Sequence, residues 1–156
     1  MENKNYLELK IPPVAVFFVF AAIMWLLAWA VPLTGVALPA KKPIAMGTAA
    51  VGGVFAAAGI LSFLRARTTV NPTTPSKAAS LVTTGVYAIT RNPMYLSLLL
   101  VLAGWAVYLS NLAALVAIPL FVGYLNRFQI LPEERALASL FSSEFQAYCK
   151  RVRRWL

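Results

Sequence analysis

The residues of this chain that could do chemistry are few, and they stand at the ends of a long uncharged run. Arg91 precedes Asn92 and Pro93 at the start of this run, and Glu133 and Glu134 follow shortly after its end. An arginine binds anionic groups and a glutamate binds cationic or polyhydroxyl groups through charged hydrogen bonds. The spacing therefore predicts a polar pocket at the edge of an apolar region.

The composition excludes most other catalytic chemistry. The chain has no His, one Cys (Cys149), and five acidic residues, all of them Glu. An intrachain disulfide, a zinc site of the Cys/His type and a Ser-His-Asp triad are therefore excluded, and we expect no metal site. The acids that remain for chemistry after the first apolar run are Glu133, Glu134 and Glu144.

Each candidate residue also has a purely structural explanation. Arg91 can anchor the chain among lipid headgroups. Acids directly after Pro132 stabilise the first turn of a helix, where the dipole favours negative charge. Neighbouring helix positions diverge by about 100°, so we do not expect Glu133 and Glu134 to face the same ligand. From the residues alone, both explanations stay open.

The composition predicts an integral membrane protein. Hydrophobic residues make up 60% of the chain and charged residues only 12%, whereas soluble domains carry roughly 25% charged residues. The net charge of +9 comes from basic residues that flank apolar runs. Anionic lipid headgroups explain this pattern better than nucleic acid, which we do not expect as a partner.

The apolar runs predict an all-α polytopic protein with about four transmembrane helices. Residues 14–31 and residues 43–64 are each long enough to cross a bilayer, and the second run contains glycines suited to close helix packing. Residues 92–126 would make roughly 50 Å of helix, which exceeds one span. Ser110 and Asn111 near the middle predict that this run folds into a helical hairpin.

The Lys and Arg residues predict the orientation. Of 14 such residues, only Lys41 and Lys42 fall on one side of the four-helix arrangement, and the other twelve fall on the opposite side. The positive-inside rule then places both termini in the cytoplasm, in the inner membrane if the cell is prokaryotic. We predict a loop over residues 65–91 and a C-terminal amphipathic helix on this side, within one domain of residues 1–156. The apolar face of that helix is formed by Leu137, Phe141, Phe145, Tyr148, Val152 and Trp155.

Two stretches together resemble a known family. The runs are LVTTGVYAITRNPMYLS, from residue 81, and EERALASLFSSEFQAYCKRVRRW, from residue 133. Their order and spacing are similar to those of the isoprenylcysteine carboxyl methyltransferase and phospholipid methyltransferase superfamily, and the motif-bearing part covers residues 68–156. The resemblance implies an integral membrane methyltransferase that uses S-adenosylmethionine without a soluble Rossmann-like fold.

The resemblance also implies where the cofactor binds. Carried over by position, the cofactor-binding candidates are Leu81, Val82, Tyr87, Arg91, Asn92, Pro93, Met94, Tyr95 and Glu133. Arg91 would be the partner of the cofactor's carboxylate. The catalytic residue is unknown, and the candidates on the substrate side are Arg127 and Gln129.

The chain departs from the family pattern at three places. Asn92 stands where the eukaryotic enzymes commonly have His, so no imidazole is available there. Ser142 and Phe145 replace the usual Gly and Tyr, which predicts a local change in the C-terminal helix. Gln129 stands where relatives acting on prenylcysteine have Arg, which argues against a carboxylate substrate.

We therefore expect methyl transfer to a lipophilic acceptor dissolved in the membrane, at a pocket on the cytoplasmic side. The acceptor is a phospholipid or lipid amine, an isoprenoid acid or alcohol, or a small hydrophobic molecule. The alternative is a non-enzymatic membrane protein, such as a transporter subunit or assembly factor, whose basic tail binds lipid. The oligomeric state cannot be read from the sequence.

Overall fold

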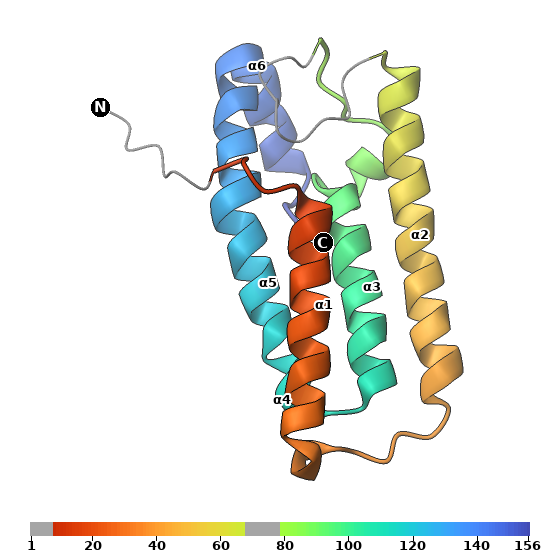
Figure 1. The fold of residues 1–156 in the computed structure, drawn as a ribbon. Helices are drawn as coiled ribbons and strands as arrows, with labels where there is room; N and C mark the ends of the chain where they lie inside the picture. Colours follow the sequence, from red (N-terminus) through yellow and green to blue (C-terminus); the bar gives the residue numbers. More distant parts are fainter. Residues whose placement is uncertain (1–7, 68–78) are drawn as a thin grey trace.

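The computed structural model describes residues 8–67 and 79–156, and in these ranges the chain is helical and contains no strand, as expected for an all-α protein. Part of the expected loop, residues 68–78, lies outside the described residues. The elements, in chain order, are α1 (Pro13–Ala30), η1 (Pro32–Thr34), α2 (Lys41–Arg65), η3 (Gly85–Ala88), α3 (Pro93–Leu109), α4 (Leu112–Leu115), α5 (Ala117–Leu125), the π-helical segment η4 (Asn126–Ile130) and α6 (Leu131–Arg151). Figure 1 shows α1, α2, α3 and α5 side by side, with α6 continuing beyond α5.

The bundle has the dimensions of a membrane domain. Among the described residues, three helical stretches are long and apolar enough to cross a bilayer: α1, α2 and Leu112–Arg151, which contains α4, α5, η4 and α6. Helix α3 is apolar but shorter, at 17 residues. The expectation of an all-α protein with membrane-spanning helices is confirmed, and the number of four spans stays a prediction.

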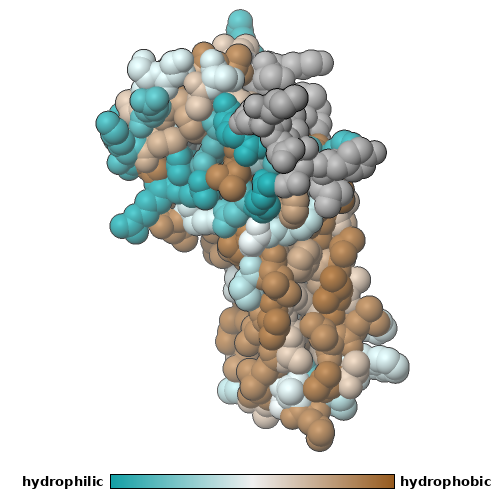
Figure 2. Space-filling model, turned by 90° about the vertical axis from the view of Figure 1, so that its left-hand side faces the viewer, coloured by the Kyte–Doolittle hydropathy of each residue, from teal (hydrophilic) through white to brown (hydrophobic). Residues whose placement is uncertain are grey.

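The outer faces of α1 and α2 are apolar. Large side chains such as Phe18, Trp29 and Val54 are 65%, 74% and 67% exposed. Figure 2 shows apolar side chains over the lower part of the molecule and hydrophilic ones gathered at the end that carries α6. An apolar surface of this extent fits hydrocarbon and not water.

Glycines allow α2 and α3 to pack closely. A Cβ atom on Gly52 would lie 2.9 Å from the carbonyl oxygen of Ser97, and one on Gly104 would lie 2.8 Å from that of Ala45. A Cβ on Gly59 would meet the side chain of Met94 at 3.0 Å. Small residues are the usual device for such close approach within membranes. The two remaining glycines of α2 have open space beside them: Gly47 and Gly53.

The predicted hairpin turn at Ser110 and Asn111 is confirmed. Ser110 has a left-handed backbone (φ 50°) and ends α3. The side-chain oxygen of Asn111 accepts hydrogen bonds from the backbone N–H of Ala113, at 2.9 Å, and of Ala114, at 3.3 Å, which caps α4. The hydroxyl of Thr34 donates to the same oxygen at 2.8 Å and ties the turn to the α1–α2 connection.

The C-terminal amphipathic helix is present, but it folds back on itself at Ser142. This residue has φ 35° and ψ −108°, which is non-helical and costly for a side chain-bearing residue. Figure 1 shows the end of α6 returning beside its beginning. The indole of Trp155 consequently donates to the side chain of Asn126 at 3.1 Å, which a straight helix would not allow. Ser142 stands where the family that the sequence resembles usually has Gly, and its positive φ is a conformation that favours glycine.

Candidate functional site

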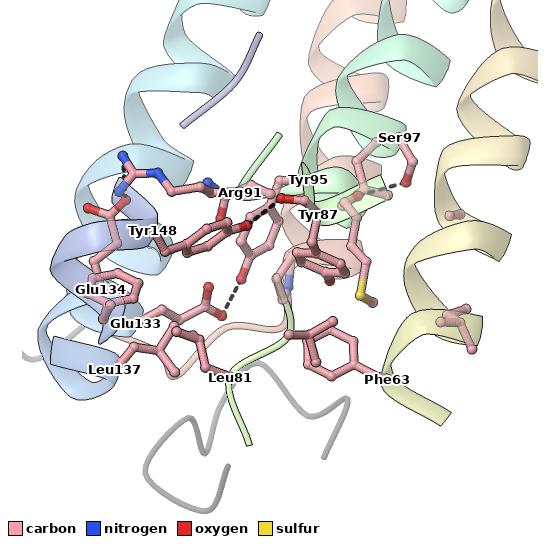
Figure 3. A pocket seen from close by; sticks show the side chains of 18 of the residues that line it. Phe63, Leu81, Tyr87, Arg91, Tyr95, Ser97, Glu133, Glu134, Leu137 and Tyr148 are labelled. Carbon is pink, nitrogen blue, oxygen red and sulfur yellow. Dashed lines mark hydrogen bonds and ion pairs between the residues drawn. The ribbon is translucent and has the colours of Figure 1, made fainter. Parts of the chain in front are cut away.

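A cavity of about 460 Å³ lies at the end of the bundle that carries α6. Its walls come from the beginnings of α1, α3 and α6, the end of α2, and the segment around η3 (Figure 3). Eight of the nine predicted cofactor-binding residues line this cavity: Leu81, Val82, Tyr87, Arg91, Asn92, Met94, Tyr95 and Glu133. The ninth, Pro93, begins α3 and is buried, outside the residues that line the cavity.

Tyr87 is held in the wall by one contact to its backbone and one to its ring. The left-handed backbone of Gly85 (φ 63°) leads into the short helix η3 that carries Tyr87. The hydroxyl of Tyr148 donates to the carbonyl of Tyr87 at 2.7 Å, and the ring of Phe63 packs edge-on at a centroid distance of 5.3 Å. Residues from α2, η3 and α6 are thereby fixed around one side of the cavity.

The polar groups at the start of α3 are bound by the returning C-terminal segment. The amide of Asn92 donates to the carbonyl of Arg154 at 2.9 Å, and the hydroxyl of Thr90 donates to the same oxygen at 3.2 Å. The backbone N–H of Arg91 donates to the carbonyl of Arg153 at 3.0 Å. The polar groups just before Pro93 therefore find their hydrogen-bond partners within the protein. Asn92 therefore lines the cavity with its amide already committed to a structural bond.

Glu133 faces the cavity from the first turn of α6. In the described part of the chain it accepts one hydrogen bond, from the hydroxyl of Tyr95 at 2.5 Å. Tyr95 is only 6% exposed, and Figure 3 shows the two side chains meeting across the cavity. A half-buried carboxylate with only a neutral donor beside it is poorly compensated, so the position favours a cationic ligand group.

Glu134 points to different partners, as the 100° divergence of neighbouring helix positions predicts. Its carboxylate forms an ion pair with Arg91, whose Nη2 lies 3.2 Å away. It also accepts two hydrogen bonds from Arg154, one from Nη2 at 2.6 Å and one from Nε at 3.1 Å. The hydrogen bond that Arg154 donates to Glu134 raises the pKa of Arg154 above its ordinary value. Two guanidinium groups share one carboxylate, so this cluster keeps one excess positive charge next to Glu133.

Arg91 therefore has more partners within the protein than the sequence indicates. Besides Glu134, its Nη1 donates to the sulfur of Cys149, whereas its buried Nε has no partner in the described residues. The prediction that Arg91 faces a ligand carboxylate stays a prediction. The structure adds that Arg91 shares Glu134 with Arg154, which the sequence does not single out.

The two substrate-side candidates lie away from the cavity. Arg127 binds Glu8, with Nη1 at 2.8 Å from the carboxylate. Gln129 is fully buried and donates to the carbonyl of Ile11 at 2.7 Å. Neither residue lines the cavity, and both fasten the segment that precedes α1.

Several cavity residues have no signal in the sequence that marks them as functional. Helical spacing places Leu137, Phe145 and Tyr148 on the apolar face of the C-terminal helix, and this face lines the cavity. Others are apolar residues at the ends of predicted membrane segments, which nothing in the pattern distinguishes from lipid-facing ones. These are Pro12, Pro13, Val14, Ala56, Ile60, Phe63 and Leu98.

The fold and the cavity define a helical membrane protein with a charged site at one end of its bundle. The chain belongs to the phospholipid methyltransferase family, whose model matches residues 41–144. An uncharacterized protein of Haemophilus influenzae is 46% identical over 63 residues, which are 40% of this chain and all of that protein. No solved structure matches the chain. The resemblance read from the two motifs is confirmed, and the family indicates a membrane methyltransferase.

Proposed function

We propose that this protein transfers a methyl group from S-adenosylmethionine to a lipophilic acceptor within the cavity at the α6 end of the bundle. The observation that carries the proposal is the separation of charge in this cavity. Glu133 offers a carboxylate whose partner in the described residues is the neutral hydroxyl of Tyr95. The neighbouring cluster of Arg91, Arg154 and Glu134 carries the opposite excess charge.

This charge pattern fits the methionine part of the donor. That part carries an ammonium group, a sulfonium and a carboxylate. Glu133 would hold the cationic groups, and Arg91 with Arg154 would hold the carboxylate through charged hydrogen bonds. The aromatic and aliphatic side chains of Tyr87, Leu81 and Val82 in the same wall would cover the apolar portions of the donor.

When bound, S-adenosylmethionine supplies an electrophilic methyl group. The protein's own task is then alignment and the exclusion of water, because methyl transfer from a sulfonium is an in-line displacement. The cavity is lined mainly by apolar side chains, and these strengthen nearby charged contacts by keeping water out. We assign no catalytic base. The acceptor must therefore arrive deprotonated or lose its proton readily.

The acceptor is proposed to be membrane-dissolved because the apolar wall is continuous with the lipid-facing surface. Val14 of α1 and Ile60 of α2 both line the cavity and are 53% and 40% exposed. A phospholipid or lipid amine, an isoprenoid acid or alcohol, and a small hydrophobic molecule all satisfy this condition. The twelve-to-two distribution of Lys and Arg supports a cytoplasmic position of the cavity and of both termini.

Calorimetry on the detergent-solubilised protein tests the proposal. We expect S-adenosylmethionine and its product S-adenosylhomocysteine to bind with a stoichiometry of one per chain. The absence of heat at millimolar ligand would contradict the proposal and favour the non-enzymatic alternative.

A further inference from the structure

The segment that leads into α1 forms one wall of the cavity and is bound to η4 and α6. Pro12 and Pro13 line the cavity, four and five residues after Glu8. Residues 8–11 bind to η4 and to Arg135 of α6 through side chains and backbone. The wall is therefore positioned by bonds that lie outside the cavity itself.

Glu8 makes the ionic part of this attachment. Its carboxylate binds Arg127 of η4 at 2.8 Å and also binds Arg135 of α6. The Glu8 side chain is only 8% exposed, although both arginines are near half-exposed. The hydrogen bond from Arg127, supported by the charge of Arg135, holds the pKa of Glu8 below its ordinary value. Glu8 is therefore ionised at neutral pH and held between two cations.

The backbone makes the second part of the attachment. The N–H of Leu9 donates to the carbonyl of Phe128 at 3.0 Å, and the carbonyl of Ile11 accepts from Gln129 at 2.7 Å. Both partners belong to η4, where the π-helical turn interrupts the regular i→i+4 pattern and makes backbone groups available to other segments. Gln129 has no exposed surface, so this bond is shielded from water.

The two prolines connect the attached residues 8–11 to the cavity wall. Pro12 adopts φ −55° and ψ 136°, and Pro13 begins α1. Proline rings fix φ, and a residue before proline is restricted to extended backbone. A shift of Ile11 is therefore passed to Pro12 and Pro13.

We propose that Glu8, Arg127 and Arg135 form an ionic latch that holds residues 8–13 as the α1-side wall of the cavity and so sets the fit of the acceptor. This inference rests on the proposed function for its catalytic consequence. Glu8 is a positioning residue, because it touches neither donor nor acceptor. The charges proposed to bind the donor lie just before α3, on α6 and in the C-terminal segment, so we expect the latch to affect the acceptor and leave donor affinity unchanged.

The test compares Glu8→Arg with the charge-swapped double variant Glu8→Arg/Arg127→Glu. The single variant repels both arginines, and the double variant restores opposite charges at the same place. Glu144→Gln serves as the matched control, because Glu144 is an exposed acid on α6. Hydrogen exchange of the peptide containing residues 8–11 reports the latch directly, without any activity. Initial rates of methyl transfer at varied concentrations of a native membrane lipid extract give kcat and an apparent acceptor KM for each variant.

We expect Glu8→Arg to speed exchange at Leu9 by about tenfold or more. The same variant should raise the acceptor KM about five- to tenfold, with kcat within about twofold. The double variant should recover both values, and Glu144→Gln should match the wild type.

Unchanged exchange at Leu9 in Glu8→Arg would overturn the latch, whether or not the protein is a methyltransferase. Faster exchange with an unchanged acceptor KM would overturn its role in acceptor fit. A wild-type protein that binds no S-adenosylmethionine would instead contradict the proposed function, and the exchange result would still decide whether the latch exists.

Discussion

The hydroxyl of Tyr95 donates to the carboxylate of Glu133 at 2.5 Å and joins the first turn of α3 to the first turn of α6 across the cavity. This bond orients the Glu133 side chain and brings no positive charge to it. The adjacent Glu134 is neutralised by Arg91 and Arg154 instead. Two neighbouring carboxylates thus have different surroundings, one facing the cavity and one paired with two arginines.

Glu133→Gln should weaken binding of S-adenosylmethionine by about 1.5–3 kcal/mol, because it removes the charge that faces the cationic donor. The amide is the same size and still accepts a hydrogen bond from Tyr95, so the fold should persist. Calorimetry measures the change. Glu144→Gln is the control and should bind as the wild type does; an equal loss at Glu144 would show that the wrong acid has been chosen.

Arg91→Ala should also weaken donor binding, by about 1.5–3 kcal/mol if Arg91 makes a charged hydrogen bond to the donor carboxylate. The substitution leaves Glu134 paired with Arg154, and the cluster loses its excess positive charge. Arg151→Ala at the exposed end of α6 is the matched control. Equal affinity of Arg91→Ala and the control, with intact folding, would assign Arg91 a purely structural role.

Ser142→Gly should raise thermal stability, by about 1 kcal/mol of unfolding free energy. Glycine adopts positive φ without the Cβ clash that Ser142 bears at φ 35°. Ser142→Ala keeps the Cβ and should not stabilise the protein. A melting temperature of Ser142→Gly at or below that of the wild type would show that the reversal is not strained.

Gly52→Ala should destabilise the protein by about 1–3 kcal/mol, because its Cβ would press on the backbone of Ser97 at 2.9 Å. Gly53→Ala is a control one position away, with nothing within 4 Å of the added atom. Alanine favours a helix over glycine, so the control should be neutral or slightly stabilising. Melting temperatures in the same detergent compare the two, and equal values would contradict the assigned α2–α3 contact.

The sequence predicts the helices and the hairpin because strong local signals mark them. Ser110 and Asn111 are a polar pair within an apolar run, and this pair forms the turn and cap. Which glycines of α2 face α3 is not readable in the same way. Lipid and the bundle interior are both apolar, so the pattern does not separate Gly52 from Gly53.

The part of the candidate site that lies in the family motif can be predicted from the sequence. The part that depends on the reversal of the chain at Ser142 cannot. Glu133 and Tyr95 follow from the family pattern, and the structure brings them together. The pairing of Glu134 with Arg154 depends on the backbone at Ser142, which returns the C-terminus to α3. The wall formed by Pro12 depends on contacts with η4, a π-helical segment that no local residue pattern predicts.

Transfer of a labelled methyl group tests the central claim most directly. Wild-type protein, Glu133→Gln and Glu144→Gln are each incubated with methyl-labelled S-adenosylmethionine and a native membrane lipid extract, and labelled products are identified. We predict label in one lipophilic product with the wild type and Glu144→Gln, and strongly reduced label with Glu133→Gln at subsaturating donor. No label in the lipid fraction, or equal label with all three proteins, would contradict methyl transfer at this site.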